Sequence, residues 1–380
     1  MKIINRLADR FAKVRSIPEG VYHKQDMQDN KPYRVHLRLR PDGSGILILN
    51  ASTILHLNPT AAEFAYHFIR GTEPEEAIKQ IASRYRVSKD IARQDYQDFL
   101  DKIETLISTP DLDPVSFLDL ERVAPHSADL TSPLRLDCAL TYRLREDAQV
   151  EYAPTKRVDR ELTTDEWRMI LDKAWQAGIP HVTFTGGEAT LRDDLPDLIA
   201  HAEKNGQVCG LLTDGLQFND KNYLELLLQT GLDHILFLLQ PDHDQSWVAL
   251  ENLMAEDIFV TVHLTLNTDN TKNIEAVLER LAQLDVKSLS LTSSEAALQD
   301  RYDIIRDKAA ALGLTLKFDL PVPYSASNPV VYEAQENTIP EGAGKAWLYI
   351  EPDGDVLPAQ GNADKLLGNL LRDEWKQIYT

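Results

Sequence analysis

The sequence predicts an α/β protein built on a partial (β/α)6 TIM-like barrel, with a small winged-helix-like α+β domain before it. From Leu134 onward, short apolar runs typical of buried strands alternate with amphipathic helical segments. Residues 33–57 instead alternate polar and apolar side chains and lead into three helical patterns. Residues 109–132 between them are rich in Pro, Asp and Ser without a sustained period, which indicates a linker.

The first domain is predicted to pair a small meander with three helices. The runs YRVHLRLR, ILILN and STILHL predict three strands, the first two joined by the turn PDGSG. Asn58-Pro59-Thr60 is a typical helix start, and this helix is expected to end near Arg70. Helical spacing predicts two further helices over residues 72–84 and 88–107.

The second domain is predicted to be a parallel sheet, because strands and helices alternate strictly along it. Its strand-like runs are LRLDCALT, HVTFTG, VCGLLT, HILFLL, IFVTVHLTL, VKSLSLT and LTLKFDL. Thr163 and Glu166 form the pattern of a capping box before one of the helices. In such barrels the active groups lie at the carboxyl ends of the strands. The last forty residues predict a strand, an Asp-Gly turn, a strand and a terminal helix.

Composition excludes several classes of function. The 380 residues are 43% hydrophobic, which suits two or three globular domains. A formal net charge of -20 would repel nucleic acid and favours a basic or neutral partner. No run approaches the roughly 18 apolar residues that cross a bilayer, and the first twenty residues lack the core of a secretory signal. We therefore predict a cytoplasmic protein with no membrane or nucleic-acid partner.

Cysteine is scarce. Cys138 and Cys209 are the two cysteines of the chain, and both lie in runs predicted to be buried strands. Two cysteines are too few for a disulfide framework, and free cysteines usually pack as small hydrophobic residues. The histidines show no mutual spacing typical of metal ligands, so no metal site is predicted.

One stretch carries a specific family signature, VTFTGGEATLRDDLPDLIAHAEKNGQVCGLLTDG. It resembles the radical S-adenosylmethionine (radical SAM) family, and the resemblance extends over about residues 134–320. Gly186-Gly187-Glu188 stands where that family has the Gly-Gly-Glu loop that contacts the amino group of the SAM methionine. Thr213-Asp214-Gly215 stands where Thr-Asn-Gly is common. The resemblance implies a vestigial SAM pocket formed by Gly186, Gly187, Glu188 and Asp214.

The resemblance also implies where an iron–sulfur cluster would bind. In that family three cysteines spaced C-x3-C-x2-C bind a [4Fe–4S] cluster, and here Leu144, Ala148 and Glu151 occupy these positions. An aliphatic side chain offers no lone pair and a carboxylate is a hard ligand, so cluster assembly and SAM cleavage are expected to fail. We therefore expect no [4Fe–4S] cluster and no cofactor, beyond weak residual SAM binding.

The end of the chain resembles the SPASM or twitch extension of peptide-modifying radical SAM enzymes. Glu341 and Ala359 stand where cysteines that bind auxiliary clusters are expected. The predicted organisation is a peptide-recognition domain over 1–108, a linker over 109–132, the barrel over 133–320 and the extension over 321–380.

The N-terminal domain resembles the PqqD-like domain, also called the RiPP recognition element of ribosomal-peptide maturation. The pattern is carried by a strand followed by LNPTA and a helix. In that family a leader peptide adds as a strand to the sheet edge and packs on the third helix. The implied peptide contacts are Thr53, Ile54, Leu55 and His56 on the strand and Tyr96, Phe99 and Leu100 on the helix. A plain core role competes with this interpretation of the helix residues.

The leading hypothesis is a cluster-free, radical-SAM-like pseudoenzyme that binds a leader or substrate peptide, or a partner enzyme, in RiPP maturation. One alternative is an enzyme with repurposed, non-radical chemistry at the barrel mouth, and another is a scaffold for an active radical SAM homologue. The sequence leaves the catalytic residues and the question of catalysis open. The polar residues expected at the mouth are Glu151, Glu188, Asp214, Gln240, Asp242, His243 and Asn267.

Overall fold

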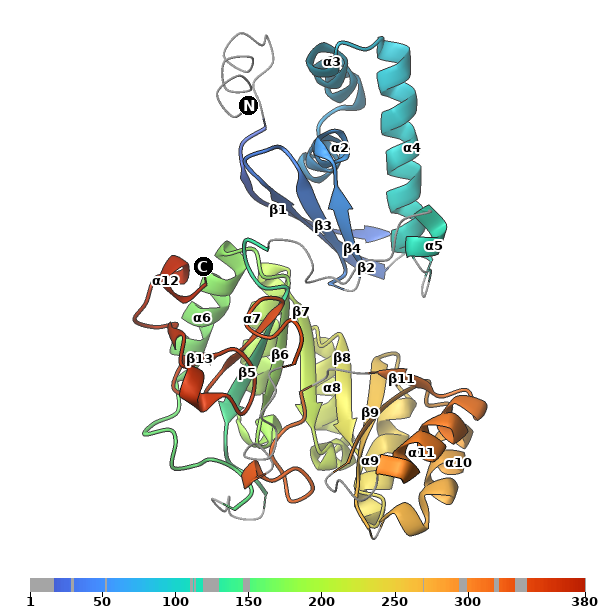
Figure 1. The fold of residues 1–380 in the computed structure, drawn as a ribbon, viewed down its shortest axis with the longest axis vertical. Coiled ribbons are helices and arrows are strands. Elements are labelled where there is room, and N and C mark those ends of the chain that lie inside the picture. Colours follow the sequence, from blue (N-terminus) through green and yellow to red (C-terminus); the bar gives the residue numbers. More distant parts are fainter. Residues whose placement is uncertain are drawn as a thin grey trace. The chain divides into compact units, whose positions relative to one another are not determined.

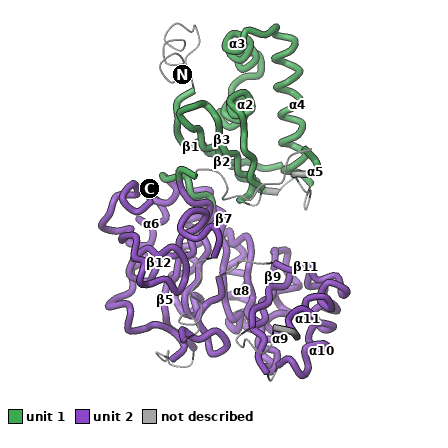
Figure 2. Tube along the Cα trace, in the orientation of Figure 1, with its two compact units in different colours: residues 1–131, 176–180 green, residues 132–175, 181–380 purple. Residues whose placement is uncertain are grey.

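The computed structural model describes residues 17–28, 31–51, 53–109, 112, 114–118, 130–145, 151–268, 270–293, 299–317, 321–331 and 340–379. The chain divides into two compact units (Figure 2). Unit 1 comprises residues 1–131 with 176–180, and unit 2 comprises residues 132–175 with 181–380. Among the described residues, none of the helices combines the length and the apolar character that crossing a membrane would require.

Unit 1 is built on a four-stranded antiparallel sheet in the order β1-β2-β3-β4. The three predicted strands are β2 (Lys31–Leu39), β3 (Gly45–Leu49) and β4 (Thr53–Leu57). The additional strand, β1 (Gly20–Gln28), pairs with β2 along its whole length. The sheet therefore has two outer edges, β1 and β4.

Three helices follow the sheet, as predicted: α2 (Pro59–Arg70), α3 (Pro74–Tyr85) and α4 (Lys89–Ser108). The Asn58 side chain accepts a hydrogen bond from the Ala61 amide at the start of α2, and Gly71 ends this helix with a positive φ of 60°. Ser88 caps α4 in the same way. A short helix, α5 (Pro114–Leu118), comes after α4.

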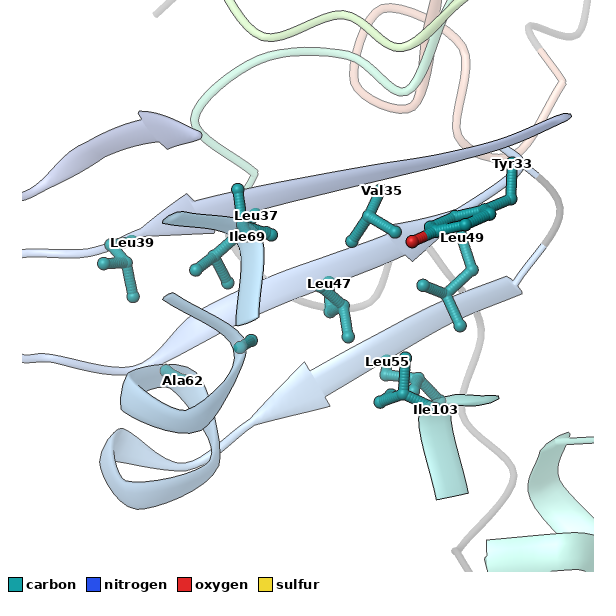
Figure 3. Packing of buried hydrophobic residues seen from close by; sticks show 11 residues of the cluster. Tyr33, Val35, Leu37, Leu39, Leu47, Leu49, Leu55, Ala62, Ile69 and Ile103 are labelled. Atoms are coloured by element: carbon teal, nitrogen blue, oxygen red, sulfur yellow. The ribbon is translucent and has the colours of Figure 1, made fainter. Parts of the chain in front are cut away.

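The core of unit 1 lies between the sheet and the helices (Figure 3). Alternate residues of the strands point into it, and Ile69 of α2 and Ile103 of α4 close it from the helix side. Leu55 of β4 packs in this same cluster with Ile103. Burial of these side chains, at roughly 25 cal/mol per Å² of apolar surface, holds α4 against the strand that forms the sheet edge.

Unit 2 confirms the predicted α/β barrel type. Seven parallel strands lie side by side in chain order (Figure 1). They are β5 (Arg135–Thr141), β6 (His181–Gly186), β7 (Val208–Thr213), β8 (His234–Leu238), β9 (Phe259–Leu266), β10 (Ser288–Ser293) and β11 (Thr315–Lys317). The connecting helices are α6 (Thr164–Gln176), α7 (Leu195–Asn205), α8 (Lys221–Gln229), α9 (Asp244–Met254), α10 (Ile274–Gln283) and α11 (Gln299–Ala311).

The predicted capping box before α6 is present. The Thr163 amide donates to Glu166 Oε2 at 2.9 Å, and the Glu166 amide donates to Thr163 Oγ1 at 3.4 Å. Gly206 ends α7 with a φ of 88°. Each helix boundary that carries such a signal is thus fixed by local chemistry.

The C-terminal segment extends the barrel sheet instead of forming a separate layer. Strand β12 (Trp347–Ile350) pairs in parallel with β5, and β13 (Asp355–Leu357) and β14 (Gly368–Asn369) continue the sheet. The Asp353-Gly354 turn joins β12 to β13, with Gly354 at a φ of 90°. The terminal helix is α12 (Trp375–Ile378). The compact unit that contains the barrel therefore includes this extension.

A buried histidine in β9 makes the stability of unit 2 depend on pH. His263 is 1% exposed, and its ring nitrogens lie 3.1 Å from Ser290 Oγ and 3.1 Å from Thr292 Oγ1. Burial lowers the pKa of His263 from 6.5 to about 4. The unfolded chain therefore binds a proton as the pH falls through 6.5, whereas the folded chain does not, and stability decreases.

We predict that the unfolding free energy of the wild-type protein falls by about 2 kcal/mol more than that of His263→Gln between about pH 7 and about pH 5. Urea denaturation followed by tryptophan fluorescence measures both curves. Using the difference between the two proteins removes the contribution of every other titrating group. Parallel curves would show that His263 does not resist protonation.

Candidate functional site

The site begins where the end of β6 meets the loop after β5. The Gly187 amide donates to Thr141 O at 2.8 Å, and the Glu188 amide donates to Arg143 O at 2.9 Å. A Cβ on Gly186 would lie 2.1 Å from Thr141 O, and one on Gly187 would lie 2.3 Å from Arg143 O. Gly186 also has a φ of 133°. Two glycines are therefore required for this close approach of two backbones.

Glu188 is held below the strand ends by donors from three residues. Its Oε1 accepts from the Thr190 amide at 2.9 Å, from Thr190 Oγ1 at 2.6 Å and from Thr213 Oγ1 at 2.8 Å. Its Oε2 accepts from the Asp214 amide at 2.8 Å. The residue is 2% exposed. Both carboxylate oxygens thus have protein partners, which fixes their position.

The charge of Glu188 is finely balanced. Burial, and after it the charge of Asp214, raise the pKa of Glu188 to about 7, although the hydrogen bonds from Thr190 and Asp214 oppose this rise. The carboxyl group of Glu188 therefore titrates closer to neutral pH than an exposed glutamate does.

Arg145 supplies the positive charge of the site. Its Nε donates to Asp214 Oδ2 at 3.0 Å, its Nη2 to Thr190 Oγ1 at 2.9 Å and its Nη1 to Gln217 Oε1 at 3.3 Å. The guanidinium thereby joins the loop after β5 to the residues that follow β6 and β7. The sequence reasoning missed Arg145, although an aspartate in place of the usual neutral amide at position 214 signals that a cation lies nearby.

A pocket of about 190 Å³ opens at these strand ends, entirely within unit 2. This volume is below the roughly 300 Å³ at which small-molecule pockets usually begin. Its lining residues come from the carboxyl ends of several strands and from the segment before β12. Among them are Leu144, Arg145, Tyr152, Gly187, Glu188, Asp214, Gln240, His243, His263, Tyr324 and Ser325.

Four of the polar residues predicted at the mouth, Glu188, Asp214, Gln240 and His243, thus line one pocket. Glu151, Asp242 and Asn267 are not among the lining residues. The sequence reasoning also missed Tyr324, which is 1% exposed and whose hydroxyl makes no hydrogen bond within the described part of the chain.

The positions predicted as former cluster ligands are occupied by ordinary packing where the structure describes them. Leu144 packs against a buried cluster that includes Tyr142, Tyr324 and Tyr349. Glu151 is exposed, and Ala148 lies outside the described residues. Glu341 is exposed in a turn before β12, and Ala359 is buried after β13.

A buried carboxylate, that of Glu351, lies next to this cluster of tyrosines. The Tyr142 hydroxyl donates to Glu351 Oε1 at 2.8 Å, and Arg157 Nη1 lies 3.1 Å from the same oxygen. Burial raises the pKa of Glu351 despite these partners. The network fixes the loop after β5 to β12.

In unit 1 the predicted peptide contacts divide into core and surface residues. Leu55 and Tyr96 are 5% and 4% exposed and belong to the core clusters. His56 is exposed, and the other four are half-buried: Thr53, Ile54, Phe99 and Leu100. Within this second group, Phe99 and Leu100 also pack partly against the core clusters. All seven remain predictions as peptide contacts.

Comparison with known proteins finds a family match in each unit. Residues 138–254 match the radical SAM superfamily, and residues 45–105 match coenzyme PQQ synthesis protein D (PqqD). The chain thus contains a radical-SAM-like region and a PqqD-like region. The recognised radical SAM region runs from Cys138 in β5 to Met254 at the end of α9, and it includes the Gly-Gly-Glu loop. The PqqD-like region runs from β3 into α4.

Two relatives are informative. The PqqA peptide cyclase of Rhodopseudomonas palustris is 26% identical over 229 residues, which are 53% of this chain and 60% of that protein. Streptococcus suis SuiB bound to the precursor peptide SuiA has a similar fold, with a TM-score of 0.59 and 15% identity over 96% of this chain and 88% of SuiB. SuiB bound to S-adenosylmethionine gives the same TM-score, over 94% and 88%.

These comparisons correct the prediction that the chain takes no cofactor. Radical SAM homologues bind SAM and an iron–sulfur cluster, so the match to this family points to both groups. The prediction was wrong because it was drawn from the side chains at three loop positions, whereas the fold and the Gly-Gly-Glu loop of the family are retained.

The residues of this chain fit SAM but do not fit an iron–sulfur cluster. The carboxylates of Glu188 and Asp214 lie at the pocket and suit a cationic ammonium group, so the site fits the amino-acid end of SAM. The chain does not offer three thiolates for a cluster. Cys138 in β5 and Cys209 in β7 are both fully buried. Burial raises the pKa of the Cys138 thiol, so this side chain stays protonated at neutral pH.

Proposed function

We propose that this protein binds a precursor peptide in ribosomal-peptide maturation, through the β4 edge and the α4 face of its PqqD-like unit. The observation that carries the proposal is the difference between the two outer edges of the sheet in unit 1. Strand β1 presents Lys24 and Asp26, whereas β4 contains no Lys, Arg, Asp or Glu. Natural sheets protect their edges with charged side chains, so β4 is the edge that is suited to accept another strand.

The domain division follows from the same proposal. Residues 1–108 recognise the peptide, residues 109–132 link the domains, residues 133–320 form the barrel, and residues 321–380 form the SPASM/twitch-like extension. The likeness to PqqD over residues 45–105 and the peptide named in the SuiB–SuiA complex support this assignment of roles.

The barrel has a supporting role in this proposal. Gly186, Gly187, Glu188 and Asp214 would hold SAM, which supplies the radical chemistry in this family. The loop after β5 offers Leu144 and Glu151 instead of thiolates, so the chain is a pseudoenzyme toward that reaction. The radical step on the peptide is then carried out by an active homologue, for which this chain presents the peptide.

The first prediction concerns the strand edge. Consecutive amides of a strand point to opposite sides. One of the variants Thr53→Pro and Ile54→Pro therefore removes an amide that is bonded to β3, and the other removes an amide that points outward from the sheet edge. We expect the variant that keeps the wild-type unfolding midpoint to bind peptide about tenfold more weakly. Fluorescence anisotropy with a fluorescein-labelled candidate leader peptide gives the affinities. Wild-type affinity in that well-folded variant would contradict docking at β4.

The second prediction concerns SAM. Because the pKa of Glu188 is about 7, its negative charge grows as the pH rises, and so does its attraction for an ammonium group. The affinity for SAM should rise roughly fivefold between about pH 6 and about pH 7 in titration calorimetry. In Glu188→Gln the affinity should be weaker and independent of pH.

Asp242→Asn is the matched control, because Asp242 is an exposed carboxylate that follows β8 and does not line the pocket. This variant should keep the wild-type rise. If Glu188→Gln showed the same rise as the wild type, another group would hold the ammonium end.

The third prediction concerns the reaction. Modification of the peptide should require an active radical SAM homologue, and this chain should accelerate it when both proteins are present. Mass spectrometry of the peptide after anaerobic incubation measures the product. Product formed by this chain alone, after supply of iron, sulfide, SAM and a reductant, would show that the chain is itself the enzyme.

A further inference from the structure

The part of α4 that follows its first turn is strongly acidic. Residues 94–108 carry four carboxylates and one ammonium group, that of Lys102. All four carboxylates are exposed, on Asp95, Asp98, Asp101 and Glu104. None of them forms an ion pair among the described residues, so their charge is directed to solvent or to a partner.

Two of these carboxylates border the apolar stripe of α4. Residues four apart share one side of a helix, which places Asp95 beside Phe99 and Glu104 beside Leu100. The stripe itself consists of the half-buried or buried side chains of Phe99, Leu100 and Ile103. The helix face that neighbours β4 is therefore apolar along its middle and negative along its sides.

Several acidic residues elsewhere in unit 1 have cationic partners within the protein. Arg93 pairs with both Asp90 and Glu75, and Arg84 pairs with the buried Glu63. Four unmatched negative charges therefore lie on the helix whose Ile103 shares a core cluster with Leu55 of β4. This is the helix that lies against the free strand edge.

The opposite face of β4 has the reverse character. His56 is exposed and points away from the Leu55 side, because side chains alternate along a strand. Burial and the charge of Arg40 lower the pKa of His56, so a positive group already lies near this face. A cation on a docked strand would be disfavoured there and favoured on the α4 side.

We propose that the β4–α4 surface selects an extended peptide whose Lys or Arg residues lie on the same face as its apolar residues, an arrangement called in phase below. This inference rests on the proposed peptide-binding function and adds the charge pattern of the ligand. In a strand, side chains at every second position face the same way, so apolar and basic residues in phase both meet α4. The apolar ones pack on the stripe, and the basic ones reach Asp95 and Glu104.

Three fluorescein-labelled synthetic peptides test the pattern on the full-length protein. Each has a central run of alternating Val and Thr. The first carries a Lys at each end in phase with Val, the second carries the same two Lys in phase with Thr, and the third carries Glu in phase with Val. By anisotropy at low salt, the first should bind about 3- to 10-fold tighter than either of the others.

Added salt should remove most of this preference, because the carboxylates on α4 are exposed to screening. Equal binding of all three peptides at low salt would overturn the charge pattern and leave peptide docking standing. Binding by none of them would contradict both the pattern and the proposed function of this surface.

The variant Asp95→Asn/Glu104→Gln removes the two flanking charges and keeps the side-chain shapes. It should weaken the first peptide about 3- to 10-fold and leave the third unchanged or tighter. The matched control is Glu256→Gln/Asp257→Asn, which removes two exposed carboxylates from unit 2 and should change neither. Equal weakening by both double variants would show that only the net charge of the protein matters.

Discussion

The polar site of the barrel depends on one close backbone contact, between the glycine loop after β6 and the loop after β5. Two amides, of Gly187 and Glu188, donate to carbonyls of Thr141 and Arg143. The contact exists because neither glycine has a Cβ, which would collide with those carbonyls. Once it is made, Glu188 enters the space below the strand ends, where Thr190, Thr213 and Asp214 donate to it. The positions of Glu188 and Arg145 follow from this contact.

Two neighbouring carboxylates at this depth require compensation. Glu188 is 2% exposed and responds by a raised pKa, so part of its population is neutral. Asp214 is held by the guanidinium of Arg145, which comes from the other loop of the same backbone contact. A buried charge that lost its partner would cost several kcal/mol. The glycine contact and the Arg145–Asp214 pair are therefore coupled, because the contact brings the loop that carries Arg145 to the end of β7.

The fold could be predicted from the sequence because local patterns of apolar residues indicate which side chains are buried. Examples are the apolar run VCGLLT of β7 and the spacing of apolar residues in α4. Strand β1 was missed for the same reason: GVYHKQDMQ has little alternation, and its pairing with β2 defines it. The pocket residues Glu188 and Asp214 were found through a family motif, whereas Arg145 reaches Asp214 across 69 positions and leaves no local pattern. The cofactor prediction failed because individual ligand positions were given more weight than the retained loop.

The two units differ in whether their carboxylates have partners within the protein, and this difference matches their proposed roles. In the barrel, Glu188 and Asp214 have partners within the protein, so their positions are fixed and mobile ions reach them poorly. On α4, Asp95 and Glu104 are exposed and unmatched, which costs little because water solvates them. A solvated, unmatched charge stays available to a partner that approaches from solvent, whereas a buried, matched one meets only a group that enters the pocket. Under the proposed function, selection of the peptide by charge would belong to the PqqD-like unit, and the barrel would contribute a preformed pocket whose affinity for a cation depends on pH.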